Sequence, residues 1–230
     1  MRMRHIGTLG AAALALLGAA SAAAQTPPVI LNALEVRQLV GRAEPGDHAR
    51  LGAHFVALAD QYAREAGRHT AMAKAMGGNP NRRSSGALGA HCARLAELNT
   101  ESAATLGELA AHHDALAAGA PSYPPIDGAR FENGEGAPAP DDRELALMAA
   151  AARTAADHAF LEEYFVTLAA RYTAGAEQHA AMASAYRANA SRRGGDPAVH
   201  CDRLVTLSRQ EAAEARAAAA EHRNLAPIGR

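Results

Sequence analysis

Histidine and cysteine side chains recur at matched positions in two parts of this chain, and both residue types bind transition metals. Eight of the eleven histidines and both cysteines belong to a repeat, whose offset is 110 residues in the first part of each copy and 109 in the second. The repeated residues are His48, His69, His91, Cys92 and His113 in one copy, and His158, His179, His200, Cys201 and His222 in the other. Such self-similarity indicates two equivalent structural modules.

The residues around these side chains follow the spacing of a buried helix face. Apolar residues alternate by three and four along residues 48–76 and 88–116, which is a heptad pattern. Two such segments joined by a Gly/Pro-containing loop predict a helical hairpin, and the second copy repeats it. A short helix is expected before each hairpin, at residues 32–42 and from about Asp142. The sequence therefore predicts an all-α fold, an antiparallel four-helix bundle made of two tandem αα-hairpin repeats, each preceded by a short helix.

The predicted helical segments divide the chain into a signal peptide, two hairpin repeats and a linker between them. Residues 1–24 have a basic start, an apolar stretch and an Ala-x-Ala site, which is typical of a cleaved signal peptide, with an uncleaved anchor as the alternative. We expect a periplasmic or secreted protein with no membrane span after signal removal. The first hairpin repeat spans 25–118, a Pro/Gly-rich linker spans 119–141, and the second repeat spans 142–230, with both repeats in one bundle.

The spacing also predicts which side chains lie level with one another. Facing residues of an antiparallel hairpin have a constant sum of residue numbers, and His48 with His113 has the same sum as His69 with Cys92. The two pairs lie roughly 31 Å apart along the helices. If the modules pair symmetrically, a main metal layer would contain His69, Cys92, His179 and Cys201. A second layer would contain His48, His113, His158 and His222, and the possible auxiliary ligands are Met72, Met182, His91 and His200.

We interpret the protein as an exported metal-binding bundle that binds, buffers or delivers copper or zinc, since thiolate, imidazole and thioether groups suit these ions. Helix N-termini close to both cysteines favour the thiolate form. One alternative is a structural or interaction bundle closed by a Cys92–Cys201 disulfide. A weaker alternative is an electron-transfer or sensor protein that holds non-covalent haem. The sequence contains no catalytic motif, so we do not expect an enzyme. The net charge of −1 gives no sign of a nucleic-acid partner.

Overall fold

The computed structural model describes residues 30–77, 85–118, 142–188 and 196–226, which form helices and contain no strand. The helices are α1 (Ala33–Arg42), α2 (Pro45–Gly77), α3 (Ser85–Leu116), α4 (Asp142–Ala151), α5 (Ala155–Ala188) and α6 (Pro197–Leu225). The predicted all-α class is confirmed. The expected signal peptide at 1–24 and the expected linker at 119–141 lie outside the described residues.

Local side-chain contacts explain where the helices begin. The Asn32 side chain accepts hydrogen bonds from the backbone of α1, and Glu35 accepts one from the Asn32 N–H at 2.8 Å, which together form a capping box. Asp196 caps α6, and Pro197 is the first residue of that helix. Pro45 is the first residue of α2, where its missing N–H has no cost.

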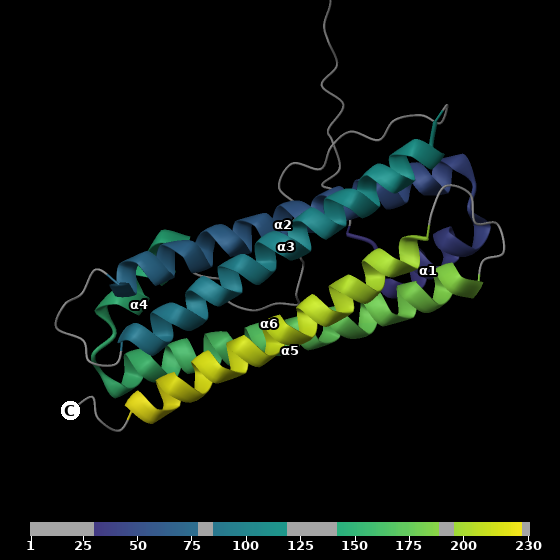
Figure 1. The fold of residues 1–230 in the computed structure, drawn as a ribbon. Coiled ribbons are helices and arrows are strands. Elements are labelled where there is room, and N and C mark those ends of the chain that lie inside the picture. The colour runs from purple at the N-terminus through teal and green to yellow at the C-terminus, as the bar shows by residue number, and fades with distance from the viewer. Residues whose placement is uncertain (1–29, 78–84, 119–141, 189–195, 227–230) are drawn as a thin grey trace, which may run out of the picture.

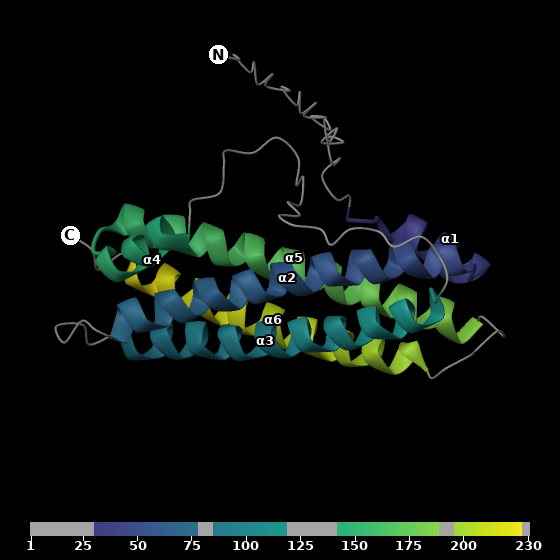
Figure 2. The same cartoon turned by 90° about the horizontal axis from the view of Figure 1, so that it is seen from above.

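Four long helices lie side by side, and the two short ones sit at opposite ends of the assembly (Figures 1 and 2). Helix α2 packs along α3, α5 along α6, and α3 against α6. The backbones of α2 and α5 stay further apart, because large side chains fill the space between them, such as Tyr62 and Tyr172 with ring centroids 6.4 Å apart. Helix α1 packs mainly on α5, and α4 mainly on α2.

Contacts between helices fix their directions. Tyr62 lies beside Tyr172, and seven residues further along α2 the His69 ring lies 6.2 Å from Phe165, which precedes Tyr172 by seven residues. Helices α2 and α5 therefore run in opposite directions. Helices α3 and α6 do the same, because His91 pairs with Glu214 near one end and His200 with Glu108 nearer the other.

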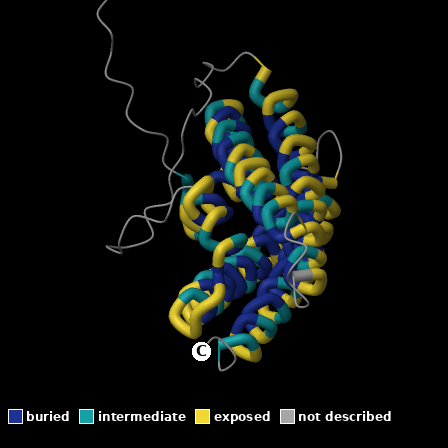
Figure 3. Tube along the Cα trace, turned by 90° about the vertical axis from the view of Figure 1, so that its left-hand side faces the viewer, coloured by how far each residue is buried: buried dark blue, intermediate teal, exposed yellow. Residues whose placement is uncertain are grey.

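The buried faces are the predicted heptad faces (Figure 3). Leu51, Phe55, Leu95 and Leu106 are fully buried, for example. The apolar core forms two clusters: one contains Cys92 with Phe165 and Leu161, and the other contains Cys201 with Phe55. The helices thus bury one continuous face each and leave their charged faces to solvent.

Candidate metal centre

Two pairs of imidazoles come together, one in each hairpin. The Nδ1 atoms of His48 and His113 lie 2.9 Å apart, and those of His158 and His222 lie 3.1 Å apart. Each pair joins the first turns of one long helix to the last turns of the next, as the predicted level pairing requires. Both contacts link residues more than 60 positions apart in sequence, so the hairpin geometry brings them together.

A phenylalanine supports each pair in the same way. Phe55 stacks on His113 with centroids 5.5 Å apart and planes 17° apart, and Phe165 stacks on His222 at 5.6 Å and 16°. Each phenylalanine follows the first histidine of its pair by seven residues, so a heptad places both on one helix face. The stacking restricts the orientation of the buried ring in both modules.

The environment of the first pair favours neutral imidazoles. Burial, with smaller contributions from the neighbouring His48, His112 and His54, lowers the pKa of His113 to about 3. Burial also lowers the pKa of the half-buried His48. A neutral imidazole keeps one nitrogen lone pair, which is the form that binds a metal ion.

One pair also has an outer contact that can set its tautomer. The Tyr186 hydroxyl lies 2.7 Å from His113 Nε2, on the ring edge opposite the His48 contact. When His113 carries its proton on Nε2, it donates to the Tyr186 oxygen and leaves the Nδ1 lone pair free. Metal-binding histidines ordinarily donate their second ring N–H to an acceptor in this way.

The predicted main layer does not form. Phe165 contacts His69 but lies 14 residues, roughly 21 Å along the helix, from His179 on α5. Likewise His91 contacts Glu214, which lies 13 residues, roughly 20 Å, beyond Cys201 on α6. The reason is the direction of the helices: the second half of α2 meets the first half of α5, so equivalent layers of the two modules lie far apart.

This separation also rules out the alternative of a Cys92–Cys201 disulfide in the folded chain, because a disulfide needs Cα atoms within about 7 Å. Both cysteines are buried free thiols in separate clusters. Burial raises the pKa of each to about 12, so the expected preference for thiolate is wrong. Desolvation of the charged form outweighs any stabilisation by a nearby helix N-terminus.

The expected auxiliary ligands do not meet at one metal site either. Met72 lies in the Cys92 cluster and Met182 in the Cys201 cluster. His91 pairs with Glu214 at 2.8 Å and His200 with Glu108 at 3.2 Å, so these imidazoles face the neighbouring hairpin and not the cysteine beside them. The two pairs are equivalent and tie α3 to α6.

Two histidines that the repeat did not highlight belong to the surroundings of the first pair. His112 makes an edge contact with His113 at 5.3 Å, and the charge of a protonated His54 would lower the pKa of His113. Neither has a histidine counterpart in the second copy, where Tyr164 and Glu221 occupy the equivalent positions. A search limited to repeated residues could not find them.

A polar layer at mid-height crosses between the modules. Asn99 on α3 donates to the hydroxyl of Tyr172 on α5 at 2.8 Å. Ser102 on α3 donates to Glu211 on α6 at 2.8 Å. The opposite directions of the hairpins bring each hydroxyl to the other module, so these bonds join the modules.

Among the described residues, no three His, Cys, Asp or Glu side chains gather as a metal site would require. None of the helices formed by these residues is long and apolar enough to span a bilayer. The chain matches no protein-family model, no curated protein and no solved structure.

Proposed function

We propose that the chain is an exported, non-catalytic metal-binding protein, folded as an antiparallel four-helix bundle of two tandem hairpin repeats. In this proposal each hairpin binds one copper or zinc ion between its paired imidazoles, His48 with His113 and His158 with His222. Binding, buffering or delivery of the ion is the expected role. The observation that carries the proposal is the same Nδ1–Nδ1 approach in both modules.

The distances suit an ion after a small adjustment. Two imidazole nitrogens on a tetrahedral ion, each about 2.0–2.1 Å from it, lie about 3.3 Å apart. The observed distances of 2.9 and 3.1 Å are a few tenths of an ångström shorter, which corresponds to one proton held between the two rings. On binding, that proton moves to the Nε2 atom of its own ring, and both Nδ1 lone pairs face the ion.

Two imidazoles leave coordination positions for water or for a donor from a delivery partner, which favours exchange over permanent retention. Neutral imidazole binds both copper and zinc ions. The buried neutral thiols take no part in this proposal.

Metal titration of the purified full-length mature chain tests it. We expect two Cu(I) or Zn²⁺ ions per chain in a chelator competition, and one ion in either His48→Gln or His158→Gln. His91→Gln and His200→Gln are matched controls, because they remove imidazoles that pair with glutamates, and both should keep two ions. Absence of tight binding, or equal stoichiometry in all four variants, would overturn the proposal.

A further inference from the structure

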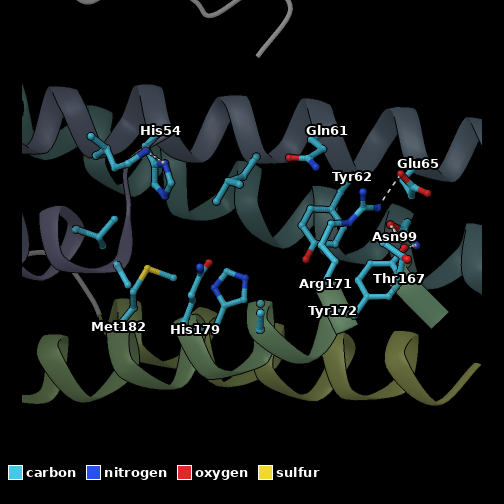
Figure 4. Close-up of a pocket in the computed structure, with 17 residues that line it drawn as sticks. His54, Gln61, Tyr62, Glu65, Asn99, Thr167, Arg171, Tyr172, His179 and Met182 are labelled. Atoms are coloured by element: carbon cyan, nitrogen blue, oxygen red, sulfur yellow. Dashed lines mark hydrogen bonds and ion pairs between the residues drawn. The ribbon is translucent and has the colours of Figure 1, made fainter. Parts of the chain in front are cut away.

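A cavity of about 370 Å³ lies between α1, α2 and α5, apart from both imidazole pairs (Figure 4). Ligand pockets in proteins start at about 300 Å³. At about 30 Å³ for one water molecule, the cavity holds about a dozen non-hydrogen atoms. The exposed residues Thr167, Ala174 and Gln178 form part of its lining, so it is open to solvent on that side.

The cavity exists because the two modules differ at equivalent positions, 110 residues apart. In one half, Glu65 is buried between α2 and α5, and the Tyr164 hydroxyl donates to it at 3.0 Å. In the other half, Gly175 stands at the position of Glu65 and His54 at that of Tyr164. Gly175 has no side chain, and even an added Cβ would make only ordinary contact with the Tyr62 hydroxyl, at 3.6 Å. The volume that a carboxylate side chain fills in one half is therefore open in the other.

The charged side chains around Glu65 are replaced by uncharged ones at the equivalent positions around Gly175. Glu65 pairs with Arg68 at 3.0 Å and with Arg171 at 2.9 Å. The equivalents of these two arginines are Gln178 and Gln61, and both line the cavity. Where one half holds a carboxylate between two guanidinium groups, the other holds an open space between two amides. Glu65 and Arg171 also line the cavity, but their charges are paired with each other at 2.9 Å. Amides donate and accept hydrogen bonds without charge, so they suit an uncharged polar group.

Two buried polar atoms of the cavity lining have no hydrogen-bond partner in the part of the chain that the structure describes. Among the described residues, Gln61 Oε1 and His179 Nδ1 are buried and accept no hydrogen bond. Such atoms are costly unless a ligand or water satisfies them. The His179 ring is only 4% exposed and points into the cavity from α5 (Figure 4). Burial lowers its pKa to about 4, so the ring is neutral at pH 7.

His54 supplies a donor from the opposite side. Its Nδ1 accepts the Leu31 N–H at 3.2 Å, so in the neutral ring the proton is on Nε2. The ring projects from α2 into the cavity (Figure 4). That tautomer cannot offer Nε2 to a metal ion, but it donates a hydrogen bond. Leu58, Val36 and Met182 provide the apolar part of the lining.

We propose that this cavity binds an uncharged aromatic or heterocyclic molecule of about a dozen non-hydrogen atoms that carries a hydrogen-bond donor and acceptor on one edge, as a cyclic amide does. The flat body packs against the apolar residues between α1 and α5. The polar edge donates to Gln61 Oε1 or His179 Nδ1 and accepts from His54 Nε2. The site is independent of the metal proposal, because neither imidazole pair lines it.

The test uses quinolin-2-one as the probe, with the metal-free full-length mature chain and calorimetric titration. Naphthalene has a similar body without the amide, and quinoline-2-carboxylate has a charge in its place. We expect one quinolin-2-one per chain, bound at least tenfold more tightly than either comparison compound. Absence of saturable binding, or equal or tighter binding of naphthalene or the carboxylate, would overturn the proposal.

Two variants locate the binding. Gly175→Leu fills the open volume, and Gly67→Leu is its control, because nothing lies within 4 Å of a Cβ at this exposed α2 position. We expect Gly175→Leu to abolish binding and Gly67→Leu to retain it. Gln61→Leu, a half-buried change that does not depend on filling the core, should weaken binding at least tenfold. Unchanged affinity in Gln61→Leu, or in a folded Gly175→Leu, would refute this site.

Discussion

Glu211 provides the sharpest test of the buried polar layer. It lies on α6 with its side chain fully buried, and Ser102 donates to its Oε1 at 2.8 Å. Its Oε2 atom has no hydrogen-bond partner among the described residues. Burial is the main cause that raises the pKa of Glu211 to about 7, against 4.5 for a free glutamate. Replacement by glutamine keeps the shape and the Ser102 bond and removes the titration.

The expected change in the free energy of unfolding follows from the link between proton binding and folding. Between pH 4.5 and 7 the unfolded chain has released this proton while the folded chain still holds it, so stability falls as pH rises through that window. The difference between the two pKa values corresponds to a loss of about 3 kcal/mol once the pH is above 7. Glu211→Gln avoids this loss. The variant should therefore gain about 2 to 3 kcal/mol relative to wild type at pH 8, compared with the difference at pH 5.

Urea unfolding of both proteins at pH 5, 6, 7 and 8 measures this difference, since the titration of all other groups is common to both and cancels. Glu177→Gln, an exposed change on α5, is the control and should give a flat difference. A flat difference for Glu211→Gln as well would mean that the carboxyl titrates as it does in water, and the reasoning from burial would be wrong.

Three further predictions concern other buried groups. Burial lowers the pKa values of His54 and His113 to about 3 and that of His179 to about 4. The free energy of unfolding should therefore fall as the pH drops below 6.5, by about 2 kcal/mol for each ring at pH 5, as measured by urea unfolding. A free energy of unfolding that does not change with pH in this range would contradict the burial of these rings. Glu65→Leu leaves two arginines without their shared carboxylate and should cost about 3 kcal/mol in urea unfolding, whereas a neutral effect would show that solvent replaces the carboxylate. Both cysteines should react at least tenfold more slowly with a thiol reagent in the native chain than after denaturation. If two thiols cannot be detected in the denatured, unreduced protein, the cysteines are not free and separate.

Matched positions in the two modules do not always make the same contacts. Most paired positions have the same role in both modules, as the two His–His contacts and the two His–Glu pairs do. Glu65 and Gly175 differ, and this one difference separates a closed ion network from an open cavity. Most matched positions thus make matched contacts, and the departure at Gly175 leaves open a volume that Glu65 fills at the equivalent place.

Local features of this chain could be predicted from residue order. The heptad spacing determined which residues are buried, because a helix face depends only on positions three and four apart. The Asn32 and Asp196 caps could be predicted because they involve atoms within one turn. The pairing of His48 with His113 followed from the geometry of one hairpin, in which a short loop fixes the level of facing residues.

Only the tertiary structure decided how one hairpin meets the other. Heptad spacing is unchanged when a hairpin is turned end for end, so this spacing alone cannot distinguish Cys92 beside Cys201 from Cys92 far from it. The observed contacts of His69 with Phe165 and of His91 with Glu214 fix the opposite arrangement. That arrangement separates the cysteines, raises their pKa values through burial, and places Gly175 where a cavity results. These properties depend on contacts between residues about 100 positions apart, which local spacing cannot encode.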